Sequence, residues 1–258
     1  MGVLDRELEY HERLYSGFAQ KHFARPAVRA LRAHMVQRIL SRTGAGSSSS
    51  VLSLGCGIGD TELLLAPHVR QLTGIDLSPR AIEQARADAG AARIANASFE
   101  QGSLDTVKGT YDVIFAIFFL HHLPGDVLDA APRRIRALLN PGGRFYSLDP
   151  SRMRLSGAIG RVIVPGLMRR YQTPDERELD AAQTADRFRA AGFEAQHDYY
   201  DFVSSPMAGL FPGWRSAYRL TRALDDAVVR VPALRRLGSN FEIYARTPGS
   251  LQPFTQQG

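Results

Sequence analysis

The segment VLSLGCGIGD, residues 51 to 60, places three glycines at alternate positions directly after a short apolar run. Because glycine has no Cβ, a loop with this spacing can turn sharply and let a ligand approach the backbone closely. A strand followed by such a loop is typical of a site that cradles a nucleotide. Gly55, Gly57 and Gly59 are therefore the first candidates for ligand binding.

The residues around the loop indicate which kind of nucleotide it binds. A dinucleotide site needs a glycine where this chain has Asp60, which argues against NAD. The next apolar run ends in TGIDLS and places Asp76 17 residues beyond Gly59. A carboxylate there can accept hydrogen bonds from both ribose hydroxyls. Since no basic residue lies beside the glycines, we expect a ligand with a ribose but without a phosphate chain.

The motifs continue in order with LTGIDLSPRAIEQAR, YDVIFAIFFLHHLPGD and LLNPGGRFYSLDP. Over roughly residues 51 to 150 the sequence resembles the class I S-adenosylmethionine-dependent methyltransferases of the small-molecule type. The resemblance implies that S-adenosyl-L-methionine is the cofactor, with the glycine loop near its methionine part, Asp76 on its ribose and the end of the third strand near its adenine. The cofactor-binding residues expected on this basis are Gly55, Cys56, Gly57, Gly59, Asp76, Leu77, Ser103, Leu104 and Ile117.

The chain departs from the family pattern in two places. Many members have an acid at the end of the third strand, where this sequence has Ser103, with Asp105 two positions on. Many also have a polar residue after the fourth strand, where this chain has Ala116 and Ile117. Contact with adenine is therefore less firmly indicated than contact with ribose, and we expect Ile117 to pack against the adenine ring.

Methyl transfer to a hydroxyl needs a positioned acceptor and removal of a proton, and histidine suits the second task near neutral pH. His121 and His122 follow the fourth strand, and Asp149 ends the fifth. Neighbouring strands end at one edge of a sheet, so a His–Asp pair is available that would fix the imidazole tautomer. Some O-methyltransferases of the family use such a pair, which implies catalytic His121, His122 and Asp149, with His121 the first choice. A structural role, in which a histidine orients the next helix, stays open.

Short apolar runs alternate with helical segments from residue 51 onward, which predicts an α/β fold. Together with the family resemblance, this indicates a doubly wound, mostly parallel seven-stranded sheet with helical cover segments. Four parts are expected: an N-terminal helical arm or lid (1–45), the cofactor-binding core (46–150), cover segments with the last helix and strands of the same sheet (151–247), and a tail (248–258). The expected strands are 51–54, 71–75, 98–102, 111–117, 143–149, one near 194–203, and 241–246.

The composition limits the partners. The net charge of +6 divides into +4 for residues 1–50, −2 for 51–150 and +4 for 151–258, so the cofactor region is slightly acidic. The flanks could favour an anionic substrate, a lipid surface or nucleic acid. No Asn/Asp-Pro-Pro-aromatic run and no aromatic-basic binding platform is present, which argues against nucleic acid. With one cysteine and no histidine cluster, no metal is expected. No apolar run is long enough to span a bilayer and no secretory signal is evident, so a cytoplasmic location is expected.

Two segments with apolar residues, Gly and Pro suit a pocket roof or lid: 155–168 (LSGAIGRVIVPGLM) and 201–214 (DFVSSPMAGLFPGW). The next helix has an apolar stripe of Ala217, Leu220, Leu224, Val228 and Val231 opposite Arg215, Arg219, Arg222 and Arg230. Two interpretations are open: a helix on a membrane surface, or an ordinary helix packed by its apolar stripe. Asp226 lies four residues from both Arg222 and Arg230, an ion-pair spacing that favours the packed helix.

The leading hypothesis is S-adenosylmethionine-dependent methyl transfer to a hydrophobic small-molecule or lipid-like acceptor, at a hydroxyl oxygen, with a histidine as general base. One alternative keeps the cofactor pocket for chemistry other than transfer, as in a lyase or cyclase. Methylation at nitrogen or carbon is another alternative. A non-catalytic partner subunit is disfavoured by the intact glycine loop and Asp76. The oligomeric state is left open.

Overall fold

The computed structural model describes residues 24–154 and 178–249, and in this part of the chain the strands form one seven-stranded sheet in the order β3-β2-β1-β4-β5-β7-β6. The pairs among β1 to β5 are parallel, whereas β7 runs antiparallel to both of its neighbours. The strands are Ser50–Leu54 (β1), Gln71–Asp76 (β2), Ala97–Gln101 (β3), Tyr111–Ile117 (β4), Leu139–Pro150 (β5), Glu194–Asp201 (β6) and Asn240–Arg246 (β7).

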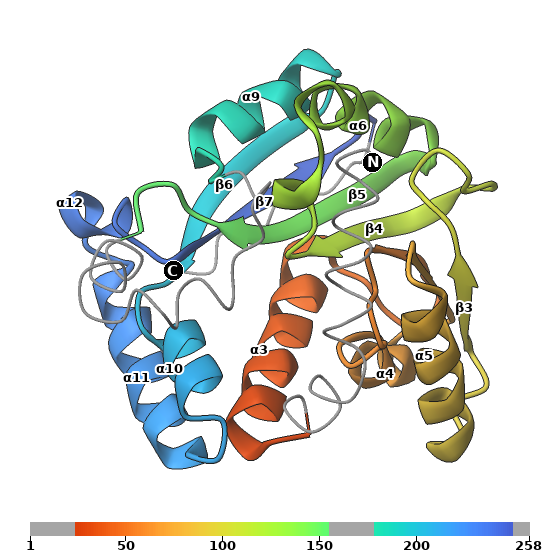
Figure 1. The fold of residues 1–258 in the computed structure, drawn as a ribbon. Helices are drawn as coiled ribbons and strands as arrows, with labels where there is room; N and C mark the ends of the chain where they lie inside the picture. Colours follow the sequence, from red (N-terminus) through yellow and green to blue (C-terminus); the bar gives the residue numbers. More distant parts are fainter. Residues whose placement is uncertain (1–23, 155–177, 250–258) are drawn as a thin grey trace.

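Helices cover both faces of the sheet (Figure 1). α6 and α9 lie on one face, and α3, α4 and α5 lie on the other, with α10 and α11 beside α3. The predicted fold class, a doubly wound and mostly parallel seven-stranded sheet, is confirmed. The described helices are Pro26–Thr43 (α3), Glu62–Leu65 (α4), Pro79–Ala91 (α5), Gly125–Ala137 (α6), Ala181–Ala190 (α9), Ser204–Leu210 (α10), Arg215–Val228 (α11) and Pro232–Arg235 (α12), with single 3-10 turns at Ala66–His68 and Leu120–His122.

Alternating side chains of the central strands enter the two cores. On β4, Val113 and Phe115 pack on the side of α3, while Ile114 and Ala116 pack on the side of α6 and α9. A strand buried on both faces reads as a continuous apolar run, because both sets of side chains leave water. The run VIFAI, residues 113–117 at the end of β4, therefore lies at the centre of the sheet.

Helix α3 belongs to this packed unit, although it precedes the Gly/Ser stretch at 44–50. Met35 and Ile39, four residues apart on one side of the helix, are fully buried against the sheet. Arg38 forms an ion pair with the buried carboxylate of Glu242 on β7, and the Tyr146 hydroxyl on β5 donates to the same carboxylate at 2.6 Å. The guanidinium donates through both Nε and Nη2, a bidentate geometry that joins α3 to β7, a strand about 200 residues later in the chain.

The expectation that α11 packs by its apolar stripe is wrong. Leu220 and Leu224 are 66% and 57% exposed, whereas Arg222 and Asp225 are buried. The ion pair expected between Arg222 and Asp226 does form, at 2.8 Å. Helix α11 therefore faces the protein with polar groups and faces outward with leucines.

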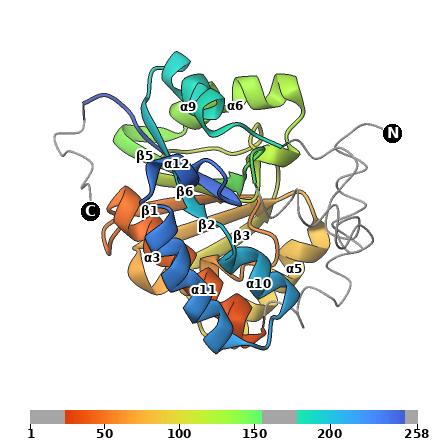
Figure 2. The ribbon, with the colours of Figure 1, turned by 90° about the vertical axis from the view of Figure 1, so that its left-hand side faces the viewer.

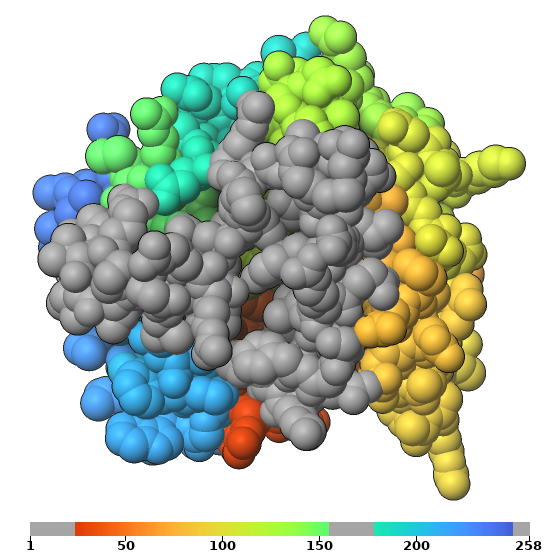
Figure 3. Space-filling view, viewed as in Figure 1, coloured from red at the N-terminus to blue at the C-terminus, as the bar shows by residue number. Residues whose placement is uncertain are grey.

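The two expected cover segments have different outcomes. Residues 155–168 lie outside the described residues, as do the first 23 residues of the N-terminal arm and the tail from 250. Residues 201–214 form the end of β6, α10 and the turn before α11, and α10 packs against α3 and α11 rather than lining the cavity described below. Figure 3 shows α10 on the left of this face of the molecule and α5 on the right. None of the described helices has the length and apolarity needed to cross a membrane.

Candidate functional site

The glycine loop follows β1, next to the point where the strand order reverses between β1 and β4. In sheets of this kind, ligands bind at the carboxyl ends of the strands beside such a reversal. Gly55 and Gly59 have φ values of +67° and +78°, a region that side chains other than glycine rarely adopt. A Cβ on Gly55 would lie 2.5 Å from the Phe119 ring, and one on Gly59 would lie 3.0 Å from Phe99. Both positions therefore require glycine.

Asp76 is the last residue of β2, and its carboxylate is fixed by two backbone donors. Its Oδ2 accepts the Gly57 N–H at 2.8 Å, and its Oδ1 accepts the Ser78 N–H at 2.9 Å. Ser78 in turn caps α5 by accepting the Ala81 N–H at 3.0 Å. Asp76, which the sequence interpretation assigns to the ribose, thus contacts the glycine loop directly.

A cavity of about 300 Å³ opens at this edge of the sheet. Its wall contains every predicted cofactor-binding residue except Gly59, which is buried behind the loop against Phe99. Burial raises the pKa of the Cys56 thiol well above its usual value, so this side chain contributes a neutral surface. The predicted residues that line the cavity are Gly55, Cys56, Gly57, Asp76, Leu77, Ser103, Leu104 and Ile117.

The cavity wall also contains charged residues that the sequence interpretation did not assign to it. The Arg32 Nε on α3 lies 2.7 Å from the Asp60 Oδ2, and the same guanidinium donates to the Thr61 hydroxyl at 3.2 Å. Asp60 entered the sequence argument only as evidence against NAD. Arg32 carries no local signal, because only the packing of α3 against the sheet brings it to the loop.

Glu62 is a fully buried acid in the same wall. Its Oε1 accepts the Ser53 hydroxyl at 2.6 Å, and no described residue provides a hydrogen-bond partner for its Oε2. Burial, together with the charge of nearby Asp60, raises the pKa of Glu62 to about 7. An acid placed in this way can receive a cationic donor from a ligand.

Replacing Glu62 with glutamine is expected to stabilise the protein at pH 8 and to change it little at pH 4. The folded state holds the Glu62 proton more tightly than the unfolded chain, so stability is lost as the pH rises from 4.5 through about 7. The loss is on the order of 3 kcal/mol, and each kcal/mol corresponds to roughly 2–4 °C in Tm for a chain of this size. Thermal unfolding at several pH values measures the difference.

The matched control is Glu83→Gln, at an exposed position on α5. It should leave the pH dependence of Tm unchanged. An equal difference in Tm between Glu62→Gln and the wild type at pH 4 and pH 8 would contradict the raised pKa of Glu62.

The chain turns sharply after β4 and places two aromatic rings in the cavity wall. Phe118 has a φ of +54°, and its N–H donates to the Leu148 carbonyl at 2.7 Å. A non-glycine residue in this conformation costs roughly 1–3 kcal/mol and persists only where the surroundings hold it. The turn brings Phe118 and Phe119 to the cavity and Phe119 against Gly55. The sequence shows the two aromatics but gives no sign of the turn.

The histidine pair occupies two different environments. His121 is buried, and its Nδ1 lies 3.0 Å from the Asp149 Oδ1, so the predicted His–Asp pairing is present. His122 lines the cavity, and its ring lies against that of His121 with centroids 3.9 Å apart. Of the pair, His122 is the one that lines the cavity, whereas the sequence interpretation put His121 first.

Comparisons with known proteins agree with this geometry. Residues 51–143 match the family model described as a methyltransferase domain. The chain is 31% identical over 179 residues to a ubiquinone biosynthesis O-methyltransferase of Methylocella silvestris, covering 65% of each protein. It is also 28% identical over 143 residues to the S-adenosyl-L-methionine-dependent Diels-Alderase iliD of a Neonectria species, covering 55% of each.

The solved structure of the [4+2]-cyclase SpnF has the same fold, with a TM-score of 0.57, 20% identity and coverage of 84% of this chain and 80% of that chain. The alignments to the first curated relatives span 36 to 65% of those relatives' lengths. The match to the family model covers the glycine loop, Asp76 and β4, the same elements that build the cavity. Residues 51–143 of this chain therefore form a methyltransferase domain, with the motifs and the fold of the class I S-adenosylmethionine-dependent methyltransferases.

Proposed function

We propose that this protein methylates a hydroxyl oxygen of an apolar small-molecule or lipid-like acceptor, with S-adenosyl-L-methionine as methyl donor and His122 as general base. The observation that carries the proposal is a single cavity that combines the glycine loop, the fixed carboxylate of Asp76 and an imidazole in one wall. When bound, the cofactor supplies a methyl group on a sulfonium, whose sulfur keeps the bonding electron pair.

The residues of the cavity suit the three parts of the cofactor. Asp76 accepts hydrogen bonds from the ribose hydroxyls, and its own orientation is fixed by Gly57 and Ser78. Leu104 and Ile117 provide apolar surface for the adenine ring, and Ser103 provides a polar group at its edge.

The charged part of the wall suits the amino-acid end of the cofactor. Arg32 offers a guanidinium for the carboxylate, a geometry in which arginine binds well. Glu62 offers the unpartnered Oε2 for the ammonium group, which would stabilise the ionised form of this buried acid. This assignment accounts for a buried carboxyl that the packing of the described residues alone leaves unsatisfied.

The acceptor is expected beside the aromatic and aliphatic side chains after β4. Phe118, Phe119, Leu123 and Val127 form a continuous apolar part of the wall, next to His122. An apolar compound with one hydroxyl suits this surface. Its carbon skeleton would pack against these four apolar side chains, and its hydroxyl would lie beside the imidazole of His122. The name of the O-methyltransferase relative, which acts in ubiquinone biosynthesis, supports an apolar acceptor of this kind.

In the proposed reaction, His122 takes the acceptor proton as the oxygen attacks the methyl carbon. The ring of His121 lies against His122, and Asp149 holds His121 through Nδ1. The buried carboxylate therefore orients the histidine pair and favours the positive charge that develops when His122 is protonated. His121 and Asp149 are positioning residues in this scheme.

A second candidate is a cyclisation in which the cofactor is bound but not consumed. The relative iliD is named as a Diels-Alderase, and the aromatic wall could fold an apolar chain. Methylation of nitrogen or carbon on a similar compound is a further alternative, because the cavity wall around His122 would bind such an acceptor equally well.

Product analysis separates these functions. Incubation of the protein with a methyl-labelled cofactor and a fractionated apolar extract should produce a labelled product, with one equivalent of S-adenosylhomocysteine released. Label in a methyl ether would support O-methylation. Label in a methyl group on nitrogen or carbon would overturn O-methylation and support N-methylation or C-methylation instead. An isomerised product without label or S-adenosylhomocysteine would support cyclisation and overturn methyl transfer.

A further inference from the structure

Large exposed apolar side chains gather in the C-terminal helices of the described chain. Trp214 is 64% exposed, close to the values for Leu220 and Leu224. We call the following set the outer apolar face: Leu210, Phe211, Trp214, Leu220, Leu224, Val231 and Leu234. Figure 2 shows α11 and α12 on the outer side of the molecule, with α3 and α10 beside them.

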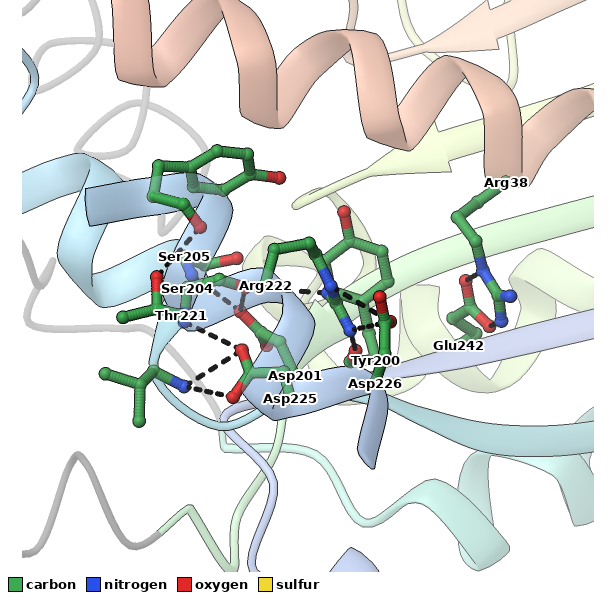
Figure 4. Close-up of polar contacts among 12 residues, drawn as sticks. Arg38, Tyr200, Asp201, Ser204, Ser205, Thr221, Arg222, Asp225, Asp226 and Glu242 are labelled. Atoms are coloured by element: carbon green, nitrogen blue, oxygen red, sulfur yellow. Dashed lines mark hydrogen bonds and ion pairs between the residues drawn. The ribbon is translucent and has the colours of Figure 1, made fainter. Parts of the chain in front are cut away.

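Arg222 binds the inner side of α11 to the rest of the protein. Arg222 donates from its Nη2 to the Tyr200 carbonyl at 2.8 Å, and its guanidinium lies 4.9 Å from the centre of the Tyr200 ring (Figure 4). The same group pairs with Asp226, four residues along the helix. The arginine is therefore bound on three sides and points toward β6.

Buried carboxylates add to this attachment. Asp225 accepts the N–H groups of Val203 and Ser204, the latter at 2.8 Å, and Asp201 accepts the Ser205 N–H at 2.7 Å (Figure 4). A rotation of α11 that buried Leu220 would break the bonds that Arg222 and Asp225 make with β6 and α10 and would leave both charges without partners. The fold therefore fixes the outward direction of the apolar face.

The charges around the outer apolar face are almost all positive. Between residues 203 and 236 the exposed acid is Asp226, which is engaged by Arg222. The exposed arginines of the same stretch are Arg215, Arg219, Arg230, Arg235 and Arg236. This excess of positive charge around apolar side chains is complementary to a partner with a negatively charged surface and an apolar interior.

An aromatic pair stands at one end of this face. The rings of Phe211 and Trp214 stack with centroids 5.4 Å apart in the turn between α10 and α11. Tryptophan favours the boundary between lipid headgroups and acyl chains, and helices with an apolar side and flanking arginines lie in the same layer. We propose that the outer apolar face docks this protein on the surface of an anionic phospholipid bilayer.

Vesicle sedimentation tests the apolar part of the proposal and is independent of methyl transfer. The wild-type protein should sediment with vesicles of phosphatidylcholine containing phosphatidylglycerol, and at least tenfold less with phosphatidylcholine alone. Leu220→Glu should lower the bound fraction at least tenfold without changing Tm, because this side chain is exposed. The control is Met153→Glu, at an apolar residue outside the face that is 54% exposed, and this variant should bind as the wild type does.

A second pair of variants tests the charges. Arg219→Gln with Arg230→Gln should weaken binding to the anionic vesicles several-fold, and added salt should have the same effect. Lys108→Gln with Arg133→Gln removes the same charge elsewhere on the surface and should have no effect. Equal binding by all variants, or no binding by the wild type, overturns the proposal. A dimer that dissociates in Leu220→Glu and ignores vesicles would assign the face to a second copy of this chain.

Discussion

Replacing Asp76 with alanine is expected to weaken binding of S-adenosylmethionine and S-adenosylhomocysteine at least about 100-fold. Each hydrogen bond to a charged group contributes roughly 1.5–3 kcal/mol, and the carboxylate is positioned to accept two from the ribose. The change also removes the acceptor of the Gly57 and Ser78 N–H groups, so the loop loses part of its support. Calorimetric titration with S-adenosylhomocysteine measures the effect without an acceptor.

Two further variants separate the charge from the support of the loop. Asp76→Asn retains an oxygen for one backbone donor and should lose less affinity than Asp76→Ala. Glu100→Ala removes an exposed acid from the adjacent strand β3 and should bind as the wild type does. Unchanged affinity in Asp76→Ala would remove the basis for placing the cofactor in this cavity.

The sequence predicts the residues of the cavity beside the glycine loop well because their determinants are local. Gly55 and Gly59 are needed for a particular backbone conformation within a few residues of β1, and Asp76 follows from the end of the next strand. The strands themselves are short apolar runs between turn residues, so all seven are placed to within a few residues. Only β5 extends well beyond its predicted limits, beginning at Leu139 rather than at 143.

The charged part of the cavity wall could not be predicted, because Arg32 and Glu62 belong to no motif and only their surroundings in the fold bring them to the cavity. Arg32 reaches the loop only when α3 lies on the sheet, an arrangement held by Arg38 and Glu242. The sequence analysis assigns no role to Glu62, whereas the structure buries it beside Ser53. For both Arg32 and Glu62, the sequence shows the type of residue but not the environment of its side chain.

Helix α11 shows the limit of periodicity as a guide to orientation. The spacing of Leu220 and Leu224 identifies an apolar stripe correctly, and a stripe usually faces the core. Here Arg222 and Asp225 make contacts with β6 and α10 that outweigh the apolar preference, so the helix is turned the other way. Arg222, one of the arginines opposite the apolar stripe in the sequence, is thus a residue that holds the helix in place.

Replacing His122 with alanine is expected to lower turnover by roughly 10²–10³ while leaving the affinity for S-adenosylhomocysteine within about twofold. The loss arises because no other described imidazole lines the cavity to take the acceptor proton. His122→Gln keeps a polar side chain but cannot act as a base near neutral pH. In this variant the fall in rate at acidic pH, caused by protonation of the base, should disappear.

Asp149→Asn tests whether the buried pair acts through His122. The asparagine preserves the shape of this fully buried site but removes the charge that fixes His121 at 3.0 Å. We expect a smaller loss of turnover than in His122→Ala, an unchanged Kd for the cofactor product and an acidic limb that is retained, because His122 is still present. If His121→Gln abolishes the acidic limb while His122→Gln keeps it, the base is His121 and the ring in the cavity wall only shapes the pocket. If both glutamine variants keep the full rate, the acceptor reacts without a histidine base, which would favour an acceptor atom that is already nucleophilic over a neutral hydroxyl.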